Sequence, residues 1–396
     1  MNNAPLLWIS AGELSGDMHA AKLASAILKQ NPDVRFAGIG GPHLRNMNSF
    51  TSYFKVEELS VMGIGEVLMQ LPGILKLLGR VREKLAELRP AALIVVDAPS
   101  FNFRVIKMAR ELDIPVYYYI SPKIWAWKQK RALFLKKNVR RLISILPFEQ
   151  DFYKRFDMEI SYVGNPLVDM IDWPRMEGIS PTPGRIGILP GSRKKEISSL
   201  MPEFGKAAAL MLRERPDLKF TCAVAPGVDK DWLRSFWPGE GDAGGAPLEL
   251  IPPDDRYAFM RGCEMLMAAS GTVTLEAALL GTPTIVAYKV SPLTWFIGKR
   301  LIRVPYLSLS NLILGRELFP ELLQEESSGE NLAARALAWL TPDAEGKSPL
   351  QAVREELKPL RRIMGEAGRG AGEGGGSTDL AASVILEDMR AMGLNG

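Results

Sequence analysis

The sequence predicts an α/β protein of two successive domains, each built around a doubly wound parallel sheet. Short apolar runs of strand length alternate with helical stretches, which is the pattern of repeated strand–helix units. The chain has 396 residues, more than a single ordinary core accommodates. Residues 165–184 hold four prolines and two glycines, and the alternation restarts after them. We therefore expect two domains joined by a proline-rich hinge and separated by a cleft.

The expected strands follow one another in the two halves of the chain. In the first half they are LLWIS, VRFAGIG, AALIVVD, PVYYYI, RRLISILP and ISYVG, with helices from about Asp17 to Gln30 and from about Phe101. In the second half they are RIGILP, KFTCAVA, LELI, EMLMAA and PTIVAY. The unbroken apolar run in AALIVVD is typical of a strand buried on both faces of a parallel sheet. We expect domains at 1–170 and 171–365, with a C-terminal helix at 378–396 joining the first domain.

The composition excludes several classes of protein. The net charge of +4, from 49 basic and 45 acidic residues, does not by itself indicate nucleic-acid binding. We expect Cys222 and Cys263 to be small buried hydrophobes in a reducing compartment, and with only two histidines a zinc site is not expected. The first apolar run is too short for a signal peptide, and no uncharged apolar run reaches the roughly 20 residues of a membrane span. We expect a cytoplasmic protein that meets a membrane only at its face.

The first loop of chemical interest, AGELSGD at residues 11–17, follows the first strand. Its glycines allow close approach of the backbone, and Ser15 or Asp17 could cap the following helix. A capped turn alone does not explain Glu13. The alternative is a loop that holds a polar ligand against the edge of the sheet, where the strands end.

A second loop places Asp97 at the end of the apolar strand AALIVVD, and Pro99 prevents that strand from continuing. A carboxylate at the carboxyl end of a central strand is placed to take a proton from a substrate hydroxyl. The alternative is that Asp97 caps the helix that begins near Phe101.

A third loop, LPGSRKKEI at residues 189–197, turns through glycine and serine into a cluster of Arg193, Lys194 and Lys195 before a helix. Backbone N–H groups and a guanidinium that can make a forked contact suit a phosphate. The pattern of a P-loop is absent. The alternative is a solvated basic helix start.

The segment AASGTVTLEAALLGTPTIVAY carries the most specific pattern. Ser270, Gly271 and Thr272 form a tight turn between a strand and a helix, and their small side chains leave N–H groups open to a diphosphate. Glu276, about one turn into the helix, could accept hydrogen bonds from a ribose diol. The alternative is a plain strand–helix–strand unit with an exposed Glu276.

The SGT-x-x-x-E pattern resembles the nucleotide-sugar site of glycosyltransferases with the GT-B fold, two Rossmann-like domains facing across a cleft. Eight segments between about Ile9 and Glu326 resemble, in order, those of bacterial lipid-A-disaccharide synthases: AGELSGD, VMGIGEVL, DAPSFN, SPKIWAWKQKR, LPFE, LPGSRKKEI, ASGTVTLE and SLSNLILGRELFPELLQEE. The resemblance implies a hexosyltransferase of lipid A biosynthesis in a Gram-negative bacterium. Its reaction joins UDP-2,3-diacylglucosamine to 2,3-diacylglucosamine 1-phosphate with inversion, and gives the β-1,6-linked disaccharide 1-phosphate and UDP.

The resemblance also implies roles for individual residues. Asp97 would be the base on the acceptor 6-hydroxyl, with Glu13 a second acid in the same pocket, and Arg193 would lie near the diphosphate. The residues that match the UDP-sugar site are Ser270, Gly271, Thr272 and Glu276, together with the polar positions Asn311, Arg316, Glu317 and Gln324. The family places these polar positions near the donor, partly across the subunit boundary of a domain-swapped homodimer. No metal or cofactor is implied.

Two features depart from the family. Asn165 stands where family members often show histidine, so the resemblance assigns it no catalytic role. The glycine-rich stretch 365–376 is unlike the shorter tail of the family, which leaves the role of the last helix and its swap open.

Substrates with acyl chains imply contact with the cytoplasmic face of the inner membrane. In the stretch 64–84 one helical face carries the apolar residues Ile64, Val67, Leu68, Leu71, Leu75 and Leu78, with Arg80 and Lys84 opposite. A second candidate pairs Trp295 and Phe296 with Lys299 and Arg300, which suits anionic headgroups. The alternatives are a core-facing helix and a packed helix with a solvated edge.

Three other functions compete with the transferase. A UDP-sugar 2-epimerase uses the same two-domain fold but needs no acylated acceptor, and a non-catalytic nucleotide-sugar binder would not need both Glu13 and Asp97. Nucleic-acid binding by the basic stretch SPKIWAWKQKRALFLKK lacks a recognised module around it. We expect Trp125 and Trp127 to pack on the wall of the first domain's cleft, with the basic residues of the stretch available to a phosphate: Lys128, Lys130 and Arg131.

Overall fold

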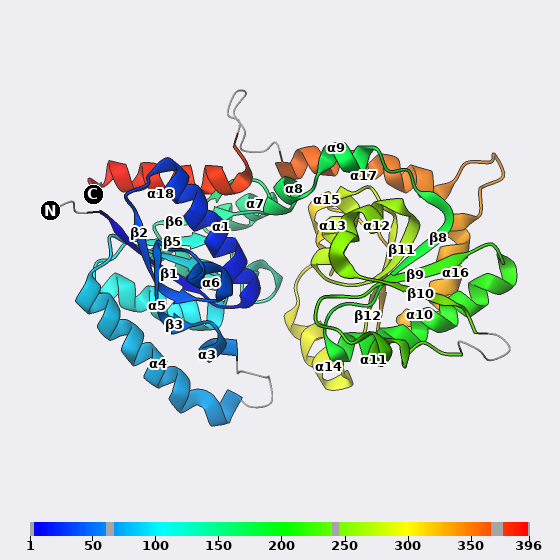
Figure 1. Cartoon of the computed structure of the whole chain (residues 1–396), viewed down its shortest axis with the longest axis horizontal. Coiled ribbons are helices and arrows are strands. Elements are labelled where there is room, and N and C mark those ends of the chain that lie inside the picture. The colour runs from blue at the N-terminus through cyan, green and yellow to red at the C-terminus, as the bar shows by residue number, and fades with distance from the viewer. Residues whose placement is uncertain (1–3, 61–66, 240–244, 366–374, 395–396) are drawn as a thin grey trace. The chain divides into compact units, whose positions relative to one another are not determined.

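The computed structural model describes residues 4–60, 67–239, 245–365 and 375–394, and the side chains at 14, 60, 67–71, 293 and 297 lie outside this description. The chain divides into two compact units. Unit 1 comprises Met1–Pro166 and Met364–Gly396, and unit 2 comprises Leu167–Ile363. Each unit is an α/β fold around a parallel sheet, which confirms the predicted fold class (Figure 1).

Unit 1 contains a seven-stranded sheet with the order β3-β2-β1-β4-β5-β6-β7. The direction in which strands are added reverses between β1 and β4, and parallel α/β sheets bind ligands at such a reversal. Ala11 pairs with Val96 in the register, so β1 and β4 end at the same level. The strands are β1 (Leu6–Ala11), β2 (Arg35–Gly40), β3 (Phe50–Lys55), β4 (Ala92–Val96), β5 (Val116–Tyr119), β6 (Arg141–Ser144) and β7 (Ser161–Tyr162).

The helices of unit 1 connect these strands, and the last helix of the chain packs beside the first (Figure 1). The sequence predicted that the first helix begins near Asp17, but the helix begins at Leu14. The helices are α1 (Leu14–Gln30), α2 (Pro42–Arg45), α3 (Glu57–Ser60), α4 (Val67–Leu88), α5 (Pro99–Glu111), η1 (Ile124–Ala126), α6 (Arg131–Asn138), α7 (Glu149–Lys154) and α18 (Ser377–Ala391).

Asp388 fixes α18 to the sheet of unit 1. Its buried carboxylate accepts hydrogen bonds from the Tyr117 hydroxyl at 2.8 Å and from Arg141 Nε at 3.0 Å, and it also pairs with Arg140. Burial alone would raise the pKa of Asp388, but the bonds from Arg140, Tyr117 and Arg141 outweigh it and lower the pKa. A segment from the end of the chain thereby becomes part of the first unit.

Unit 2 contains a six-stranded sheet with the order β10-β9-β8-β11-β12-β13, and its reversal lies between β8 and β11. The register pairs Leu189 with Ala268 and Ala269 with Ala287, so β8, β11 and β12 end side by side. The strands are β8 (Thr182–Leu189), β9 (Lys219–Ala223), β10 (Leu248–Ile251), β11 (Cys263–Ala269), β12 (Thr284–Tyr288) and β13 (Glu321–Leu323).

The predicted linker at 165–184 is largely ordered secondary structure, because two short helices and the start of β8 lie within it. Two strands were not predicted. They are the edge strands β3 and β13, which lack the continuous apolar run of a central strand. The helices of unit 2 are α8 (Pro166–Met170), α9 (Trp173–Glu177), α10 (Lys194–Glu214), α11 (Lys230–Arg234), η2 (Pro253–Asp255), α12 (Arg256–Gly262), α13 (Thr272–Leu279), α14 (Pro292–Leu301), α15 (Leu309–Leu314), η3 (Gln324–Ser327), α16 (Gly329–Leu340) and α17 (Pro349–Gly365).

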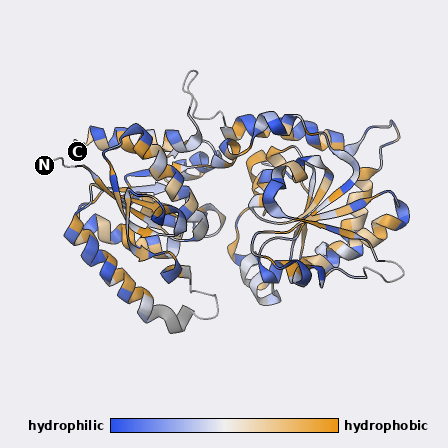
Figure 2. Cartoon of the chain, in the orientation of Figure 1, coloured by the Kyte–Doolittle hydropathy of each residue, from blue (hydrophilic) through white to orange (hydrophobic). Residues whose placement is uncertain are grey.

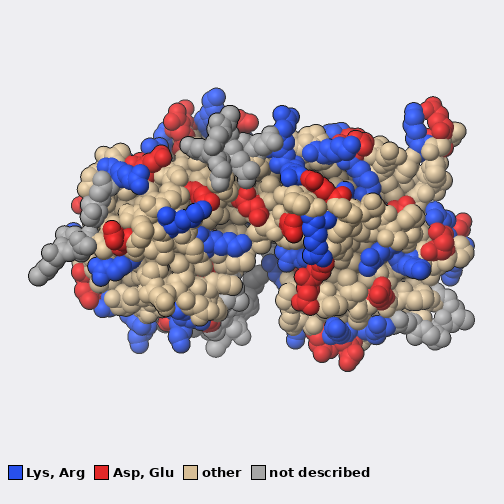
Figure 3. All heavy atoms as spheres, turned by 45° about the horizontal axis from the view of Figure 1, so that its top comes forward, with Lys and Arg blue, Asp and Glu red and all other residues tan. Residues whose placement is uncertain are grey.

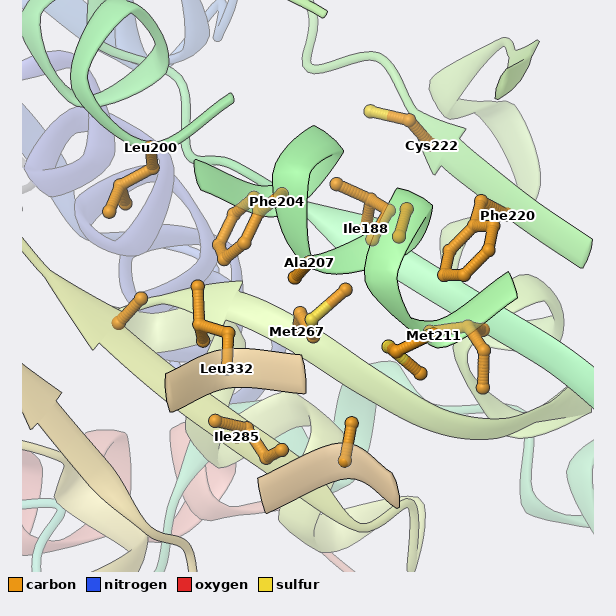
Figure 4. Packing of buried hydrophobic residues seen from close by; sticks show 14 of the residues in the cluster. Ile188, Leu200, Phe204, Ala207, Met211, Phe220, Cys222, Met267, Ile285 and Leu332 are labelled. Atoms are coloured by element: carbon orange, nitrogen blue, oxygen red, sulfur yellow. The ribbon is translucent and has the colours of Figure 1, made fainter. Parts of the chain in front are cut away.

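The core of unit 2 forms where α10 and α16 cover one face of the sheet. Figure 4 shows Phe204 and Met211 of α10 directed toward Ile188 and Met267 of the central strands, with Leu332 of α16 beside them. The hydropathy colouring shows the same division, with apolar strands inside and striped helices outside (Figure 2).

Both cysteines belong to the buried interior, as predicted. Cys222 and Cys263 are free and buried, and burial raises the pKa of each thiol to about 12. Neither is a thiolate near neutral pH, which fits a packing role.

The described surface carries both signs of charge over both units. On the face shown in Figure 3, basic and acidic side chains are interspersed. No helix in the described part of the chain is long and apolar enough to cross a membrane.

We predict that Asp388→Ala destabilises unit 1 by about 2 kcal/mol, because it leaves the Tyr117 hydroxyl buried without its acceptor. The melting temperature of that unit should fall by roughly 4–8 °C in calorimetry. Glu387→Ala, at the exposed neighbouring position, is the control and should change it little. Equal melting temperatures for the two variants would contradict the role given to Asp388.

Candidate active site

The carboxyl edge of the unit 1 sheet carries a strained turn at Asp97 and Ala98. Their φ angles are +60° and +41°, in the left-handed region that side chains rarely occupy. Ala98 is the N-cap residue of α5, and no side chain caps this helix. The alternative that Asp97 caps the helix is therefore wrong.

Buried hydrogen bonds hold the backbone of this turn. Asn102 donates from Nδ2 to the Asp97 carbonyl oxygen at 2.7 Å, and Tyr118 donates from its hydroxyl to the same oxygen at 3.3 Å. The Asn102 amide is in turn fixed by Ser10, whose hydroxyl donates to Oδ1 at 2.6 Å. The half-buried Asp97 carboxylate itself accepts no hydrogen bond within the described part of the chain, so it is available to a ligand.

Two glycines of the first loop pack closely against this turn. A Cβ added to Gly12 would lie 1.8 Å from the Cβ of Ala98, which is an impossible contact. A Cβ added to Gly16 would lie 3.2 Å from the Cβ of Asp97. Glu13, exposed between these glycines, is the N-cap residue of α1. The loops that carry Glu13 and Asp97 thus lie against each other.

Asp17 has a different role from the predicted cap of the first helix. Its buried carboxylate accepts hydrogen bonds from the backbone N–H groups of Gly41 at 2.7 Å and His43 at 2.8 Å. It therefore caps α2. Ser15 lies inside α1, so neither Ser15 nor Asp17 is the N-cap residue of that helix.

In unit 2 the loops after β8, β11 and β12 meet at one edge. Gly191, with φ of +97°, turns the chain into α10, where Arg193 is the N-cap residue. The Arg193 side chain is 81% exposed and donates from Nη1 to Glu196 at 2.7 Å. Burial raises the pKa of Tyr288 at the end of β12. The charge of Glu196 raises this pKa further and the charge of Arg193 lowers it, so these loops are close in space.

The predicted turn at Ser270–Thr272 lies at the same edge. The Ser270 N–H donates to the Ala287 carbonyl at 3.1 Å, which fixes the turn to β12. Gly271 is the N-cap residue of α13, and Gly271 and Thr272 are both exposed. Space is open around the Cα of Gly271, so nothing in the described fold blocks a ligand from its backbone.

Glu276 is buried rather than exposed, so the alternative of a plain exposed glutamate is wrong. Its Oε1 accepts a hydrogen bond from Arg256 at 2.8 Å and a longer one from the Tyr257 hydroxyl at 3.4 Å. Burial raises the pKa of Glu276 and the guanidinium of Arg256 opposes that rise. A ligand at this carboxylate must share it with Arg256.

The polar segment 311–324 folds around its own side chains. Asn311 is fully buried, donating to the Phe319 carbonyl and to Glu321 and accepting from the N–H groups of Leu318 and Phe319. Gln324 exchanges two hydrogen bonds with the backbone of Val290. In the described structure both amides therefore shape the segment.

The remaining two predicted positions of that segment are exposed. Arg316 forms an ion pair with Glu356 of α17, and Glu317 follows it on the surface. The segment lies next to the predicted UDP site, because α15 packs against α13.

The structure describes the side chains of only some of the predicted membrane-facing residues. Ile64 lies outside the described residues, and Val67, Leu68 and Leu71 lie in α4 with side chains outside the description. Leu75 is 57% exposed. Leu78, which the sequence placed on the same face, is buried, as are Leu77, Val81 and Leu85, so it does not contribute to an exposed surface.

The second membrane candidate presents an aromatic ring with cations. Phe296 is 57% exposed, and the Arg300 guanidinium carbon lies 3.5 Å from its ring centroid. Lys299 is exposed and Trp295 is half-buried. Leu301 and Ile302 extend the exposed apolar surface.

Among the described residues, no group of three or more His, Cys, Asp or Glu side chains could hold a metal ion.

Comparison with known proteins decides the family. The sequence profile described as lipid-A-disaccharide synthetase matches residues 7–362. The chain belongs to the lipid-A-disaccharide synthase family. It is 38% identical to the enzyme of that name from Myxococcus xanthus, with 93% of this chain and 95% of the relative covered. It is 34% identical to the enzyme from Geobacter sulfurreducens, with 98% of each covered.

Solved structures show the same fold at low identity. Acinetobacter baumannii MurG matches with a TM-score of 0.60 and 13% identity, over 96% of this chain and 99% of that one. A UDP-GlcNAc 2-epimerase from Neisseria meningitidis, bound to UDP-GlcNAc, matches with a TM-score of 0.57 and 12% identity, over 98% and 99%. These likenesses concern the fold alone. The family match, not the fold, separates the chain from the epimerase alternative.

We predict that Asn102→Ala destabilises the protein by roughly 2–3 kcal/mol, because it leaves the Asp97 carbonyl and the Ser10 hydroxyl without their partner. Denaturant unfolding measures this loss. Asn138→Ala is the matched control, since Asn138 makes a single bond to a helix carbonyl. A loss no larger than that of the control would show that Asn102 does not hold the turn.

Proposed function

We propose that this protein transfers 2,3-diacylglucosamine from UDP to the 6-hydroxyl of 2,3-diacylglucosamine 1-phosphate. The chain matches the lipid-A-disaccharide synthase family over nearly its whole length, and this membership supports the reaction. The observation that carries the mechanism is the strained turn that presents the Asp97 carboxylate beside the loop of Glu13.

Asp97 acts as the general base in this proposal. Its carboxylate takes the proton of the acceptor 6-hydroxyl while the oxygen attacks the anomeric carbon of the donor. The bond between that carbon and the UDP oxygen breaks, and UDP leaves with the electron pair. Attack from the opposite face inverts the centre and gives a β-1,6 linkage. Glu13 serves as a second acid that orients the acceptor.

The edge of unit 2 stabilises the departing UDP. Arg193 and the open N–H groups at Gly271 and Thr272 neutralise the developing charge on the diphosphate. Glu276 accepts from the ribose diol with the oxygen that Arg256 does not occupy. No step of this proposal needs a metal ion or an organic cofactor.

The polar segment next to this edge completes the donor site. We infer that the buried amide of Asn311 and the half-buried amide of Gln324 set its shape, while Arg316 and Glu317 are the members placed to reach the donor or a second subunit. A domain-swapped homodimer, as the family resemblance implies, would bring this segment to the partner's site.

We predict that Asp97→Asn lowers turnover by at least about 100-fold, because the amide cannot take the hydroxyl proton. UDP affinity should change less than about twofold, since the donor lies against the other unit. Disaccharide formation and UDP titration measure the two quantities. Asp33→Asn, at an exposed position of unit 1, should behave as the parent does. Near-normal turnover by Asp97→Asn would remove Asp97 from its role.

We also propose peripheral contact with the cytoplasmic face of the inner membrane. The exposed ring of Phe296, flanked by Lys299 and Arg300, can insert at the headgroup level while the cations meet anionic lipid. Leu75 on α4 supplies a second exposed apolar contact.

We predict that the double change Phe296→Ser and Arg300→Gln lowers binding to vesicles of phosphatidylglycerol by about tenfold, and that salt weakens the parent's binding. Cosedimentation measures the bound fraction. Leu133→Ser, which removes an exposed leucine of α6, is the control. Salt-insensitive binding, or equal binding by all three proteins, would count against this surface.

A further inference from the structure

The segment between β5 and α6 lies at the same edge as the Asp97 turn. Tyr119 ends β5 and pairs in register with Val96 at the end of β4, so the chain after each strand leaves the sheet at the same level. The segment then passes through η1 to Lys128 and on to Arg131, the first residue of α6. Both loops follow neighbouring central strands of unit 1.

Lys128 and Arg131 form a pair of neighbouring cations on this segment. The Lys128 Nζ lies 3.9 Å from the ring centroid of Trp127, and the Arg131 guanidinium carbon lies 4.9 Å from that of Phe103 on α5. Desolvation, and then the nearby Arg131, lowers the pKa of Lys128. Within the described residues neither cation forms an ion pair with a carboxylate.

Arg131 also connects electrostatically to the Asp97 turn. The Tyr118 hydroxyl donates to the Asp97 carbonyl, and its pKa is raised first by burial. The charge of Asp97 raises that pKa further and the charge of Arg131 lowers it, so both groups lie within electrostatic reach of one phenol. A site with two cations near a base suits a substrate that carries both an anion and a reactive hydroxyl.

We propose that Lys128 and Arg131 bind the phosphate of the acceptor beside Asp97, and that Glu149 positions them by anchoring Trp125. This inference rests on the proposed function, because it assigns the acceptor's phosphate to a place in unit 1.

Glu149 anchors the segment from inside the unit. It is buried at the start of α7, where its Oε1 accepts from the Trp125 indole N–H at 2.9 Å and its Oε2 accepts from the Ser144 hydroxyl. The Trp125 ring also packs edge-on against Phe148, with centroids 5.0 Å apart. Gln129 donates to the Trp125 carbonyl at 2.9 Å, which fixes the chain just before Arg131.

Burial raises the pKa of Glu149 to about 7, although hydrogen bonds from Ser144, Trp125 and Ser121 oppose the rise. The titratable groups that face it are the phenols of Tyr153 on α7 and Tyr162 on β7. Burying a carboxyl group costs stability, and the hydrogen bond that Glu149 accepts from Trp125 offsets part of that cost.

The test compares two acceptors, 2,3-diacylglucosamine with and without the 1-phosphate. For the parent, kcat/KM and direct binding should both favour the phosphorylated acceptor. The change of Lys128 and Arg131 to Ala should reduce that preference by about 100-fold, since two charge-assisted contacts are lost. The KM for the UDP-sugar should not change. Lys137→Ala, at the other end of α6, is the control.

The positioning role of Glu149 has its own readout. Glu149→Ala should lose most of the phosphate preference, and Glu149→Gln should keep it, because the amide oxygen still accepts from the Trp125 indole. A protein that is merely destabilised would lose activity with both acceptors equally and keep their ratio.

Three outcomes separate the possibilities. If the double variant keeps the parent's preference for the phosphorylated acceptor, the assignment of Lys128 and Arg131 is wrong. If the double variant loses binding to phosphatidylglycerol vesicles but keeps that preference, the pair binds a lipid headgroup instead, and the proposal is also wrong. If the parent makes no disaccharide, the proposed function fails, while direct binding of the two acceptors still decides whether the pair recognises phosphate.

Discussion

The left-handed turn at Asp97 and Ala98 is the constraint on which the edge of unit 1 depends. Two consecutive non-glycine residues in this region cost of order 1–3 kcal/mol each. Asn102 and Tyr118 offset that cost by binding the Asp97 carbonyl inside the fold. Because the backbone turns this way, residue 12 can carry no side chain, and a carboxylate stands at the reversal of the sheet.

Asp97 at the edge of unit 1 and the acids at the edge of unit 2 differ in their partners, as the proposed roles of a base and of a diphosphate site require. In the described structure the Asp97 carboxylate has no hydrogen-bond donor, as a base awaiting a substrate hydroxyl requires. In unit 2 the acids near the predicted diphosphate site are paired with cations, Glu196 with Arg193 and Glu276 with Arg256. Those pairs balance the local charge in the described structure, and under the proposed function a diphosphate would compete with Glu196 for Arg193.

Sequence patterns predicted the repeated strand–helix units and the loops after the central strands, because apolar runs and glycine-rich turns are local signals. Contacts between distant residues were not accessible in this way. Asp17 caps a helix that begins at Pro42, and Asn102 is held by Ser10 from the first strand. The burial of Glu276 depends on Arg256 in another helix. Each of these roles is decided by the tertiary fold, which a single sequence does not display.

The measurement that tests the account most directly is the product formed by the purified parent protein from UDP-2,3-diacylglucosamine and 2,3-diacylglucosamine 1-phosphate with EDTA present. The account predicts stoichiometric UDP and a disaccharide 1-phosphate whose anomeric proton shows a β-1,6 linkage. UDP released without a disaccharide, or a disaccharide with retained configuration, would contradict it. So would a donor that remains unconsumed by folded protein in detergent.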